Sequence, residues 1–192
     1  MALRFLKTIV IILCFSLITF SQTVTVKIIE TSDVHGAIFP YDLKDNKETN
    51  NSLARVTTYL KEQRADTNQI VFLLDNGDIL QGDPVVYYYN FEKTDTIHLY
   101  ANVMNFMRYD AATIGNHDIE TGHDVYDKFN KELNFPWLAA NAINTETNQS
   151  YFKPYTTIER GGVKIAVLGL ITPAIPQWLP EKIWSGMRFD DM

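Results

Sequence analysis

The sequence predicts an α/β fold built on a largely parallel sheet. Segments rich in β-branched and aliphatic residues alternate with segments whose apolar residues recur at helical spacing, and this order is typical of such folds. One apolar run, residues 70–74, is continuous, as in a strand that is buried on both faces. Two later extended segments joined by Gly161-Gly162 add an antiparallel hairpin.

Six segments are predicted strands. The first alternates and is β-branched, the second is the continuous apolar run, and the third is a short apolar stretch. The fourth is assigned from its neighbours more than from its own propensity, and the last two flank the glycine pair. In order, they are residues 24–30, 70–74, 111–114, 138–142, 151–159 and 163–171.

Four segments are predicted helices. The first places Leu53, Val56 and Leu60 on one face and has Asn51 or Ser52 as its N-cap. The second begins at a proline, which is favoured in the first helical turn, and the other two follow helical spacing. In order, they are residues 52–64, 84–90, 96–109 and 122–133. Three prolines, at 173, 176 and 180, are expected to break regular structure after the hairpin.

The first 21 residues predict a secretory signal peptide. Arg4 and Lys7 precede an uncharged apolar run over residues 8–20, and the small residue Ser21 stands before Gln22. A transmembrane anchor is the alternative, but the run is shorter than the ~20 residues that a spanning helix needs. We therefore expect cleavage near Ser21-Gln22, no stable membrane anchor afterwards, and a periplasmic or secreted protein.

Charge and cysteine content narrow the possible partners. Removing residues 1–21 takes away two basic residues and no acidic one, which moves the formal net charge from −6 to −8. An acidic chain is not attracted to a nucleic-acid polymer, so any phosphate must be bound locally. Cys14 is the only cysteine, so residues 22–192 depend on their core or on bound ions rather than on disulfides.

Three polar clusters follow predicted strands. Open α/β folds place their chemistry at the carboxyl ends of strands, so these clusters are expected to meet. Their carboxylates, imidazoles and amide oxygen suit two divalent ions, which the sequence leaves open among Zn, Mn, Mg, Ca, Co and Fe. The clusters are Asp33-Val34-His35-Gly36, Asp75-Asn76-Gly77-Asp78 and Gly115-Asn116-His117-Asp118.

The first two clusters offer candidate metal ligands. Asp33 and His35 are two residues apart, so on an extended strand end both can face one ion; the alternative is an Asp-initiated turn. Asp78 is preferred to Asp75 as a bridging ligand because Gly77 permits a close approach, whereas Asp75 still belongs to the strand. The alternative there is an Asn-Gly turn.

In the third cluster, Asn116 offers a neutral oxygen ligand, and His117 is placed beside the ions as a donor to a phosphoryl oxygen. The alternative is that Asn116 and Asp118 cap the following helix. Outside the clusters, His98 is interpreted as a packing or surface residue and His123 as solvent-facing.

The run Tyr87-Tyr88-Tyr89 has two interpretations. Aromatic faces can stack on any nucleobase. The alternative, which we favour from the sequence, is a packed helix face.

Five stretches of the chain resemble the calcineurin-like metallophosphoesterases. Within that family, they resemble the secreted bacterial 5′-nucleotidases and 2′,3′-cyclic-nucleotide phosphodiesterases. The resemblance implies a four-layer α/β sandwich around two mixed sheets. The stretches, which cover most of residues 24–178, are IIETSDVHGAIFP, FLLDNGDILQGDP, YDAATIGNHDIETG, FPWLAANAI and IAVLGLITPAIPQW.

The resemblance also implies roles for particular residues. Asp33 and His35 would bind the first metal, Asp78 would bridge both metals, and Asn116 would bind the second. His117 would stabilise the transition state or protonate the leaving group, while a metal-held hydroxide attacks phosphorus.

Two departures from the family pattern affect these implications. Glu120 stands where an aspartate often orients the catalytic histidine, and Asp118 is the other candidate partner of His117. The family also supplies later histidine ligands, whereas no histidine follows His123. We therefore expect residues 22–192 to be the N-terminal portion of a metallophosphoesterase catalytic domain, truncated at the C-terminus.

The function expected from these features is release of phosphate from nucleotides. The enzyme would be a dinuclear metallophosphoesterase of the 5′-nucleotidase or 2′,3′-cyclic-nucleotide phosphodiesterase type, with a nucleotide or related phosphate ester as its substrate. The alternative is a non-catalytic remnant that binds a metal or a nucleotide.

Overall fold

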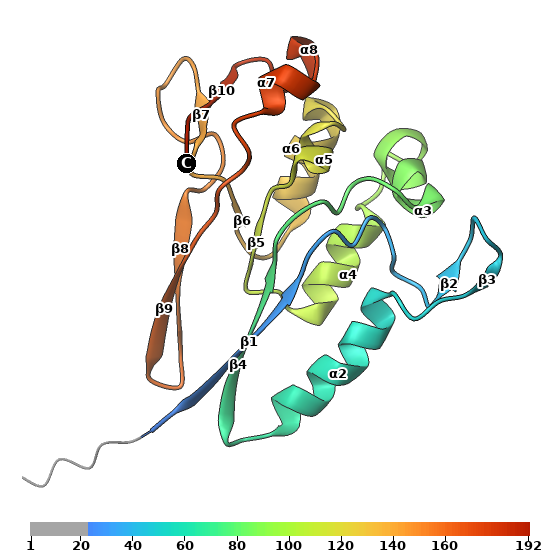
Figure 1. The fold of residues 1–192 in the computed structure, drawn as a ribbon, viewed down its shortest axis with the longest axis vertical. Coiled ribbons are helices and arrows are strands. Elements are labelled where there is room, and N and C mark those ends of the chain that lie inside the picture. The colour runs from blue at the N-terminus through green and yellow to red at the C-terminus, as the bar shows by residue number, and fades with distance from the viewer. Residues whose placement is uncertain (1–22) are drawn as a thin grey trace, which may run out of the picture.

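A four-stranded parallel sheet forms the centre of the structure, a computed structural model that describes residues 23–192 (Figure 1). The predicted signal peptide lies outside these residues. The strand order is β1-β4-β5-β6, so each new strand is added on the same side of the sheet. The strands are β1 (Thr25–Thr31), β4 (Gln69–Asp75), β5 (Ala111–Thr113) and β6 (Trp137–Leu138).

Helices connect these parallel strands, and α2 and α4 lie together on one side of the β1–β4 pair (Figure 1). Helix α2 begins where the sequence predicts, because Ser52 Oγ accepts a hydrogen bond from the Arg55 N–H at 3.3 Å. The helical segments are α2 (Leu53–Ala65), α3 (Pro84–Tyr87), the π-helical turn η1 (Tyr88–Glu92), α4 (Leu99–Met107), α5 (Asn116–Ile119) and α6 (His123–Glu132).

Antiparallel pairs complete the described part of the chain, and one of them is the predicted hairpin that follows the parallel strands. The hairpin of β8 and β9 lies on the side of β1 and β4 opposite to α2 (Figure 1). Its Arg160 donates to the Val71 carbonyl at 2.5 Å and places its guanidinium 4.9 Å from the centre of the Phe72 ring. The pairs are β2 (Tyr41–Asp42) with β3 (Lys47–Glu48), β7 (Ala142–Asn144) with β10 (Met187–Phe189), and β8 (Tyr155–Arg160) with β9 (Val163–Leu168).

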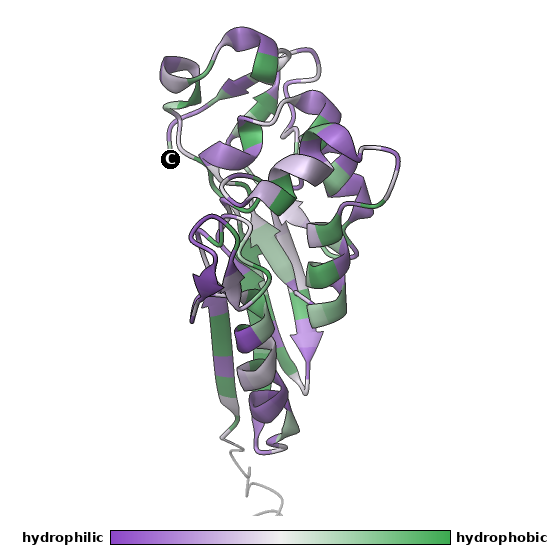
Figure 2. Cartoon of the chain, turned by 90° about the vertical axis from the view of Figure 1, so that its right-hand side faces the viewer, coloured by the Kyte–Doolittle hydropathy of each residue, from purple (hydrophilic) through white to green (hydrophobic). Residues whose placement is uncertain are grey.

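The core lies between the sheet and its helices. Figure 2 shows hydrophobic residues concentrated along the strands, while the helices carry both hydrophilic and hydrophobic residues. Trp137, Tyr100, Tyr126 and Phe129 are among the largest fully buried side chains. Within residues 23–192, no helix has the length and apolar character needed to cross a membrane.

Three predicted elements differ in the structure. The strand expected over residues 138–142 is divided, because Ala139 and Ala140 donate their N–H groups to the later carbonyls of Lys153 and Gly169. The helix expected from residue 96 starts at Leu99. The prolines do not abolish helical structure, since Pro176 lies in the first turn of α7, where a missing N–H costs nothing. The short helices are α7 (Ile175–Trp178) and α8 (Glu181–Trp184).

Side-chain placement corrects two further expectations. Tyr87 and Tyr88 are 59% and 49% exposed, so the packed-face interpretation is wrong for both. His123 is half-buried rather than solvent-facing. Its Nδ1 lies 3.1 Å from Asp127 Oδ2, and its Nε2 lies 2.9 Å from the carbonyl oxygen of Ser185. His98 is buried and caps α4, accepting from the Tyr100 N–H at 3.1 Å, so its packing interpretation is confirmed.

Candidate metal centre

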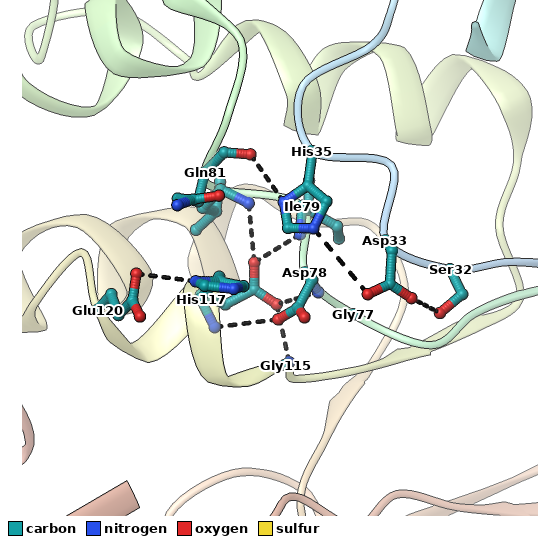
Figure 3. A network of polar contacts seen from close by, with 12 residues as sticks. Ser32, Asp33, His35, Gly77, Asp78, Ile79, Gln81, Gly115, His117 and Glu120 are labelled. Atoms are coloured by element: carbon teal, nitrogen blue, oxygen red, sulfur yellow. Dashed lines mark hydrogen bonds and ion pairs between the residues drawn. The ribbon is translucent and has the colours of Figure 1, made fainter. Parts of the chain in front are cut away.

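Loops from β1, β4 and β5 meet at the carboxyl edge of the sheet (Figure 3). The first two are joined by main-chain hydrogen bonds from Asp33 N to Gly77 O at 3.1 Å and from His35 N to Asp78 O at 3.0 Å. The third loop approaches through the His117 N–H, which donates to Asp78 Oδ1 at 3.0 Å. The three polar clusters therefore converge on Asp78.

Three of the predicted ligands have left-handed backbone conformations. The φ angles of Asp33, His35 and Asp78 are 51°, 45° and 59°. Non-glycine residues rarely adopt positive φ, and such conformations persist only where the surrounding structure holds them. Here the hydrogen bonds between the loops hold them. Backbone conformations of this kind cluster at functional sites, which supports the candidate site at this edge of the sheet.

Donor atoms from three side chains gather in one place. In the described part of the chain, His35, Asp78 and His117 each present a possible ligand atom within 4.8 Å of the others. Asp33 Oδ1 lies 4.0 Å from His35 Nε2, which places a second carboxylate at the edge of the same group. Figure 3 shows His35, Asp33 and His117 surrounding Asp78.

The chemistry of this donor set fits a divalent cation. His35 Nδ1 lies 3.1 Å from the Gln81 carbonyl, to which only a protonated nitrogen can donate. In the neutral imidazole, the lone pair is then on Nε2, the nitrogen that faces Asp33. A carbonyl that fixes the tautomer of a ligating histidine is a common supporting contact in metal sites. Gln81 is a residue that the sequence analysis missed, because only the folded loop brings its carbonyl to His35.

Asn116 is the first residue of α5 and lies next in sequence to His117, a member of the donor group. Its neighbours Gly115 and His117 both touch Asp78, and a Cβ on Gly115 would lie 2.0 Å from Asp78 Oδ1. The close approach of the β4 and β5 loops therefore requires glycine at 115 for steric reasons, since the side chain of Asp78 occupies the space. The glycine that precedes Asn116 is the feature of the sequence that reflects this steric requirement.

Glu120 is the side-chain partner of His117. Its Oε2 lies 2.8 Å from His117 Nδ1, and the two side chains are 33% and 30% exposed. Partial burial alone would lower the pKa of His117, but the hydrogen bond and charge of Glu120, with the charges of Asp78 and Asp118, raise it above its usual value. The contact engages Nδ1 of His117 and not Nε2.

Asp118 holds the loops together rather than orienting His117. This fully buried carboxylate accepts four main-chain hydrogen bonds at 2.8 to 3.0 Å. Burial raises its pKa to about 6, although the N–H donors favour the charged form. Asp118 therefore caps α5 through the Gly115 N–H, as the capping interpretation predicted. Its hydrogen bonds with the distant residues of the β4 loop were not predicted from the sequence. The donors are Asp78, Ile79, Leu80 and Gly115.

Asp75 is separate from the donor group. Its carboxylate is buried and accepts from Thr31 Oγ1 at 2.5 Å and from the Gly77 N–H at 2.9 Å. Burial raises the pKa of Asp75 to about 7, with the hydrogen bonds opposing the shift. Asp75 therefore supports the turn that carries Asp78, and Asp78 is the carboxylate that faces His35 and His117.

Comparison with known proteins relates this arrangement to a family. The chain is 32% identical over 185 residues to the trifunctional nucleotide phosphoesterase protein YfkN of Bacillus subtilis, covering 88% of this chain. It is 28% identical over 184 residues to the 2′,3′-cyclic-nucleotide 2′-phosphodiesterase/3′-nucleotidase of Yersinia enterocolitica, covering 90% of this chain. It spans only 12% and 28% of the lengths of these two relatives.

A solved structure shows the same fold. The crystal structure of calcineurin-like phosphoesterase YfkN from Bacillus subtilis matches with a TM-score of 0.77 and 30% identity over 89% of this chain and 55% of that one. This match confirms the predicted mixed α/β class with its parallel sheet. The model of the calcineurin-like phosphoesterase family matches residues 26–187, which include all three converging loops. The chain belongs to the calcineurin-like phosphoesterase family.

Proposed function

We propose that this chain is the N-terminal catalytic portion, residues 22–192, of an exported phosphohydrolase that releases phosphate from nucleotides. The substrates would be of the 5′-nucleotide or 2′,3′-cyclic-nucleotide type. The observation that carries the proposal is the convergence of donor atoms from His35, Asp78 and His117 within 4.8 Å. The nucleotide class is supported by the names of the relatives described above.

The residues divide into ligands and a proton donor. Asp33 and His35 would hold one divalent ion, Asp78 would bridge to a second, and Asn116 would complete the protein's share of that second site. When bound, such ions would supply Lewis acidity and lower the pKa of water. His117, with Nδ1 held by Glu120, would donate from Nε2 to a phosphoryl oxygen or to the leaving group.

Phosphate release by the full-length gene product tests this function. We expect metal-dependent release from AMP or from 2′,3′-cyclic AMP with at least one of Mn, Zn, Co, Ca and Mg. The Asp78→Asn variant should lose most of the activity because a neutral amide cannot bridge two cations, whereas Asp66→Asn, on the exposed end of α2, should retain it. No release with any of these metals would refute the proposal.

A second candidate is a metal- or nucleotide-binding role without turnover. The small number of donor side chains favours this role. Among residues 23–192, His35, Asp78 and His117 form the one group of three or more histidine, cysteine or carboxylate side chains that could hold a metal ion. Calorimetric titration of the 192-residue chain with Mn²⁺ separates the two roles. Binding that depends on His35 without phosphate release by the full-length product would favour the second candidate.

A further inference from the structure

A hollow of about 420 Å³ opens at the edge of the sheet opposite to the candidate metal centre. It lies where α2 ends, β4 begins and the β8–β9 hairpin turns, at the lower end of the view in Figure 1. Strand β4 begins with Gln69 in the hollow and ends with Asp75 near the metal centre, so about 20 Å of strand separates the two places at ~3.3 Å per residue. The hollow therefore shares no residue with the candidate metal centre.

Three arginine side chains line this hollow. Arg64 lies in the last turn of α2, Arg108 follows α4, and Arg160 ends β8. Asp110 is the one carboxylate among the lining residues, so three positive charges face one negative charge. The whole chain has a net charge of −6, and this local excess runs against it. A concave surface with such an excess attracts an anionic ligand.

The protein holds two of the three guanidinium groups in place. Arg160 forms an ion pair with Asp110. Arg64 donates to the carbonyl of Met107 at 2.6 Å and to that of Arg108 at 2.9 Å. A guanidinium has five N–H donors, so both arginines keep donors for a further partner. Because they are already ordered, binding an anion costs little of their conformational entropy.

The single carboxylate does not balance the three cations. Partial burial lowers the pKa of Arg64, the charge of Asp110 opposes this shift, and the charges of Arg160 and Arg108 add to it. The three guanidinium groups are therefore close enough to repel one another. An anion bound among them would offset that repulsion.

Arg108 stands at a position where glycine is usual. It ends α4 in the left-handed conformation, with φ 58° and ψ 61°. Helices commonly end on such a residue, and glycine is favoured there because a side chain opposes the conformation. In the described part of the chain, the hydrogen bonds of Arg108 are made by its main chain, with Asn105 and Arg64. Its exposed guanidinium is thus available to a ligand.

We propose that this hollow binds a phosphate dianion, either free or as the terminal group of an ester, between Arg108 and Arg64. A guanidinium presents paired N–H donors that match two oxygens of a phosphoryl group. The two charges of the dianion balance the excess of two positive charges in the hollow, whereas a monocarboxylate balances only one. The site does not depend on phosphate release at the metal centre.

Calorimetric titration of the 192-residue chain with inorganic phosphate at pH 8 tests this site. EDTA is present throughout, so that no metal holds phosphate at the candidate metal centre. We expect saturable binding, and Arg108→Gly and Arg64→Gln should each weaken it by about ten-fold or more, because each removes charge-assisted hydrogen bonds. Acetate should bind more weakly than phosphate because it carries one charge.

Phenyl phosphate, titrated in parallel, distinguishes the two sources of the dianion. Tighter binding than that of inorganic phosphate assigns the site to an ester. Equal or weaker binding assigns it to the free ion.

Arg108→Gly separates binding from folding. Glycine suits a φ of 58°, so the urea concentration at which the chain unfolds should not fall although the affinity for phosphate does. Arg188→Gln is the matched control, because Arg188 is an exposed arginine that pairs with Asp190 at 2.9 Å and does not line the hollow. This variant should bind phosphate as tightly as the unmodified chain. Absence of saturable phosphate binding, or equal affinities for Arg108→Gly and Arg188→Gln, overturns the site.

Discussion

Asp118 Oδ2 accepts a hydrogen bond from the main-chain nitrogen of Asp78 at 3.0 Å, across 40 residues of sequence. The same oxygen accepts from Gly115 N at 2.8 Å, so one buried atom ties the β4 loop to the β5 loop. The other oxygen accepts from Ile79 and Leu80, both at 2.8 Å. Asp118 is thus a positioning residue, because it fixes the backbone from which Asp78 extends.

Removing this carboxylate should destabilise the fold. In Asp118→Ala, four N–H groups lose their acceptor, two of them buried and two partly buried, and each unsatisfied buried group costs about 1–3 kcal/mol. We expect the free energy of unfolding in urea to fall by about 3 kcal/mol or more, and Asp118→Asn to lose part of that amount because one amide oxygen remains an acceptor.

Asp66→Asn is the control for Asp118. Asp66 also accepts main-chain and side-chain hydrogen bonds, from Asn68, but it is exposed. The free energy of unfolding should therefore change by less than about 1 kcal/mol. If Asp118→Ala unfolds at the same urea concentration as the unmodified chain, Asp118 does not hold the loops together.

Local sequence patterns were sufficient to predict most elements of the fold. The spacing of Leu53 and Leu60 and the capping serine predicted α2 to within a residue at each end, since both signals are local. The start of α4 was missed because a histidine side chain, His98, provides the N-cap. The predicted fourth strand was divided because its backbone groups pair with segments that come later in the chain.

Only part of the candidate site could be predicted from the sequence. Clusters at strand ends indicated which side chains meet, because parallel strands bring their carboxyl ends to one edge. The positive φ angles of Asp33, His35 and Asp78 were not predictable, since hydrogen bonds between distant loops impose them. The choice between Glu120 and Asp118 as the partner of His117 likewise depended on the direction in which each side chain points from a four-residue helix.

The Glu120 contact should be visible in the titration of His117. Partial burial lowers the pKa of His117, and the hydrogen bond and charge of Glu120 more than compensate. Glu120→Gln removes the charge, so the pKa of His117 should fall, which an NMR titration of the ring protons measures. By linkage, the raised pKa contributes stability that is present below pH 6.5 and is lost as the pH rises through the native value.

Glu159→Gln serves as the control for that titration, because Glu159 is an exposed residue of the β8–β9 hairpin. His117 should titrate at the same pH in this variant and in the unmodified chain. An unchanged midpoint in Glu120→Gln would show that the carboxylate does not act on the imidazole.

Gly115→Ala should disturb the candidate centre by steric conflict alone. Gly115 has a φ of −90°, which alanine adopts freely, but the added Cβ would lie 2.0 Å from Asp78 Oδ1 and 2.4 Å from Asp78 N. Asp78 must therefore move, and the affinity for Mn²⁺ measured by calorimetry should fall by about ten-fold or more, as when a metal site loses supporting contacts.

Gly186→Ala provides the opposite case. Its φ is +79°, so alanine at this position should lower the free energy of unfolding by roughly 1 kcal/mol. A Cβ there meets no atom within 4 Å, so the substitution does not disturb the metal centre. Its Mn²⁺ affinity should be unchanged although its stability falls. Equal Mn²⁺ affinities for the two alanine variants would contradict the steric argument.

His98 should make the fold sensitive to acid. Its Nδ1 accepts from the Tyr100 N–H and its Nε2 faces Asn90 Oδ1, so the buried ring is neutral with the proton on Nε2. Burial, with a smaller effect from Lys128, lowers the pKa of His98 to about 4, while Glu132 opposes the shift. The unfolded chain therefore binds a proton at a higher pH than the native one does, and the contribution of His98 to stability is complete above pH 6.5 and is lost as the pH falls toward 4.

Comparison with His98→Asn isolates this effect. Asparagine is a good N-cap and retains an acceptor for the Tyr100 N–H, but it does not titrate. Between pH 7.5 and 5.5, the unmodified chain should lose roughly 1 kcal/mol more unfolding free energy than the variant. Asp75 and Asp118, whose raised pKa values act in the opposite direction, are present in both proteins and cancel in the difference. If urea unfolding gives both proteins the same pH dependence, His98 is not the buried neutral group that its hydrogen bonds indicate.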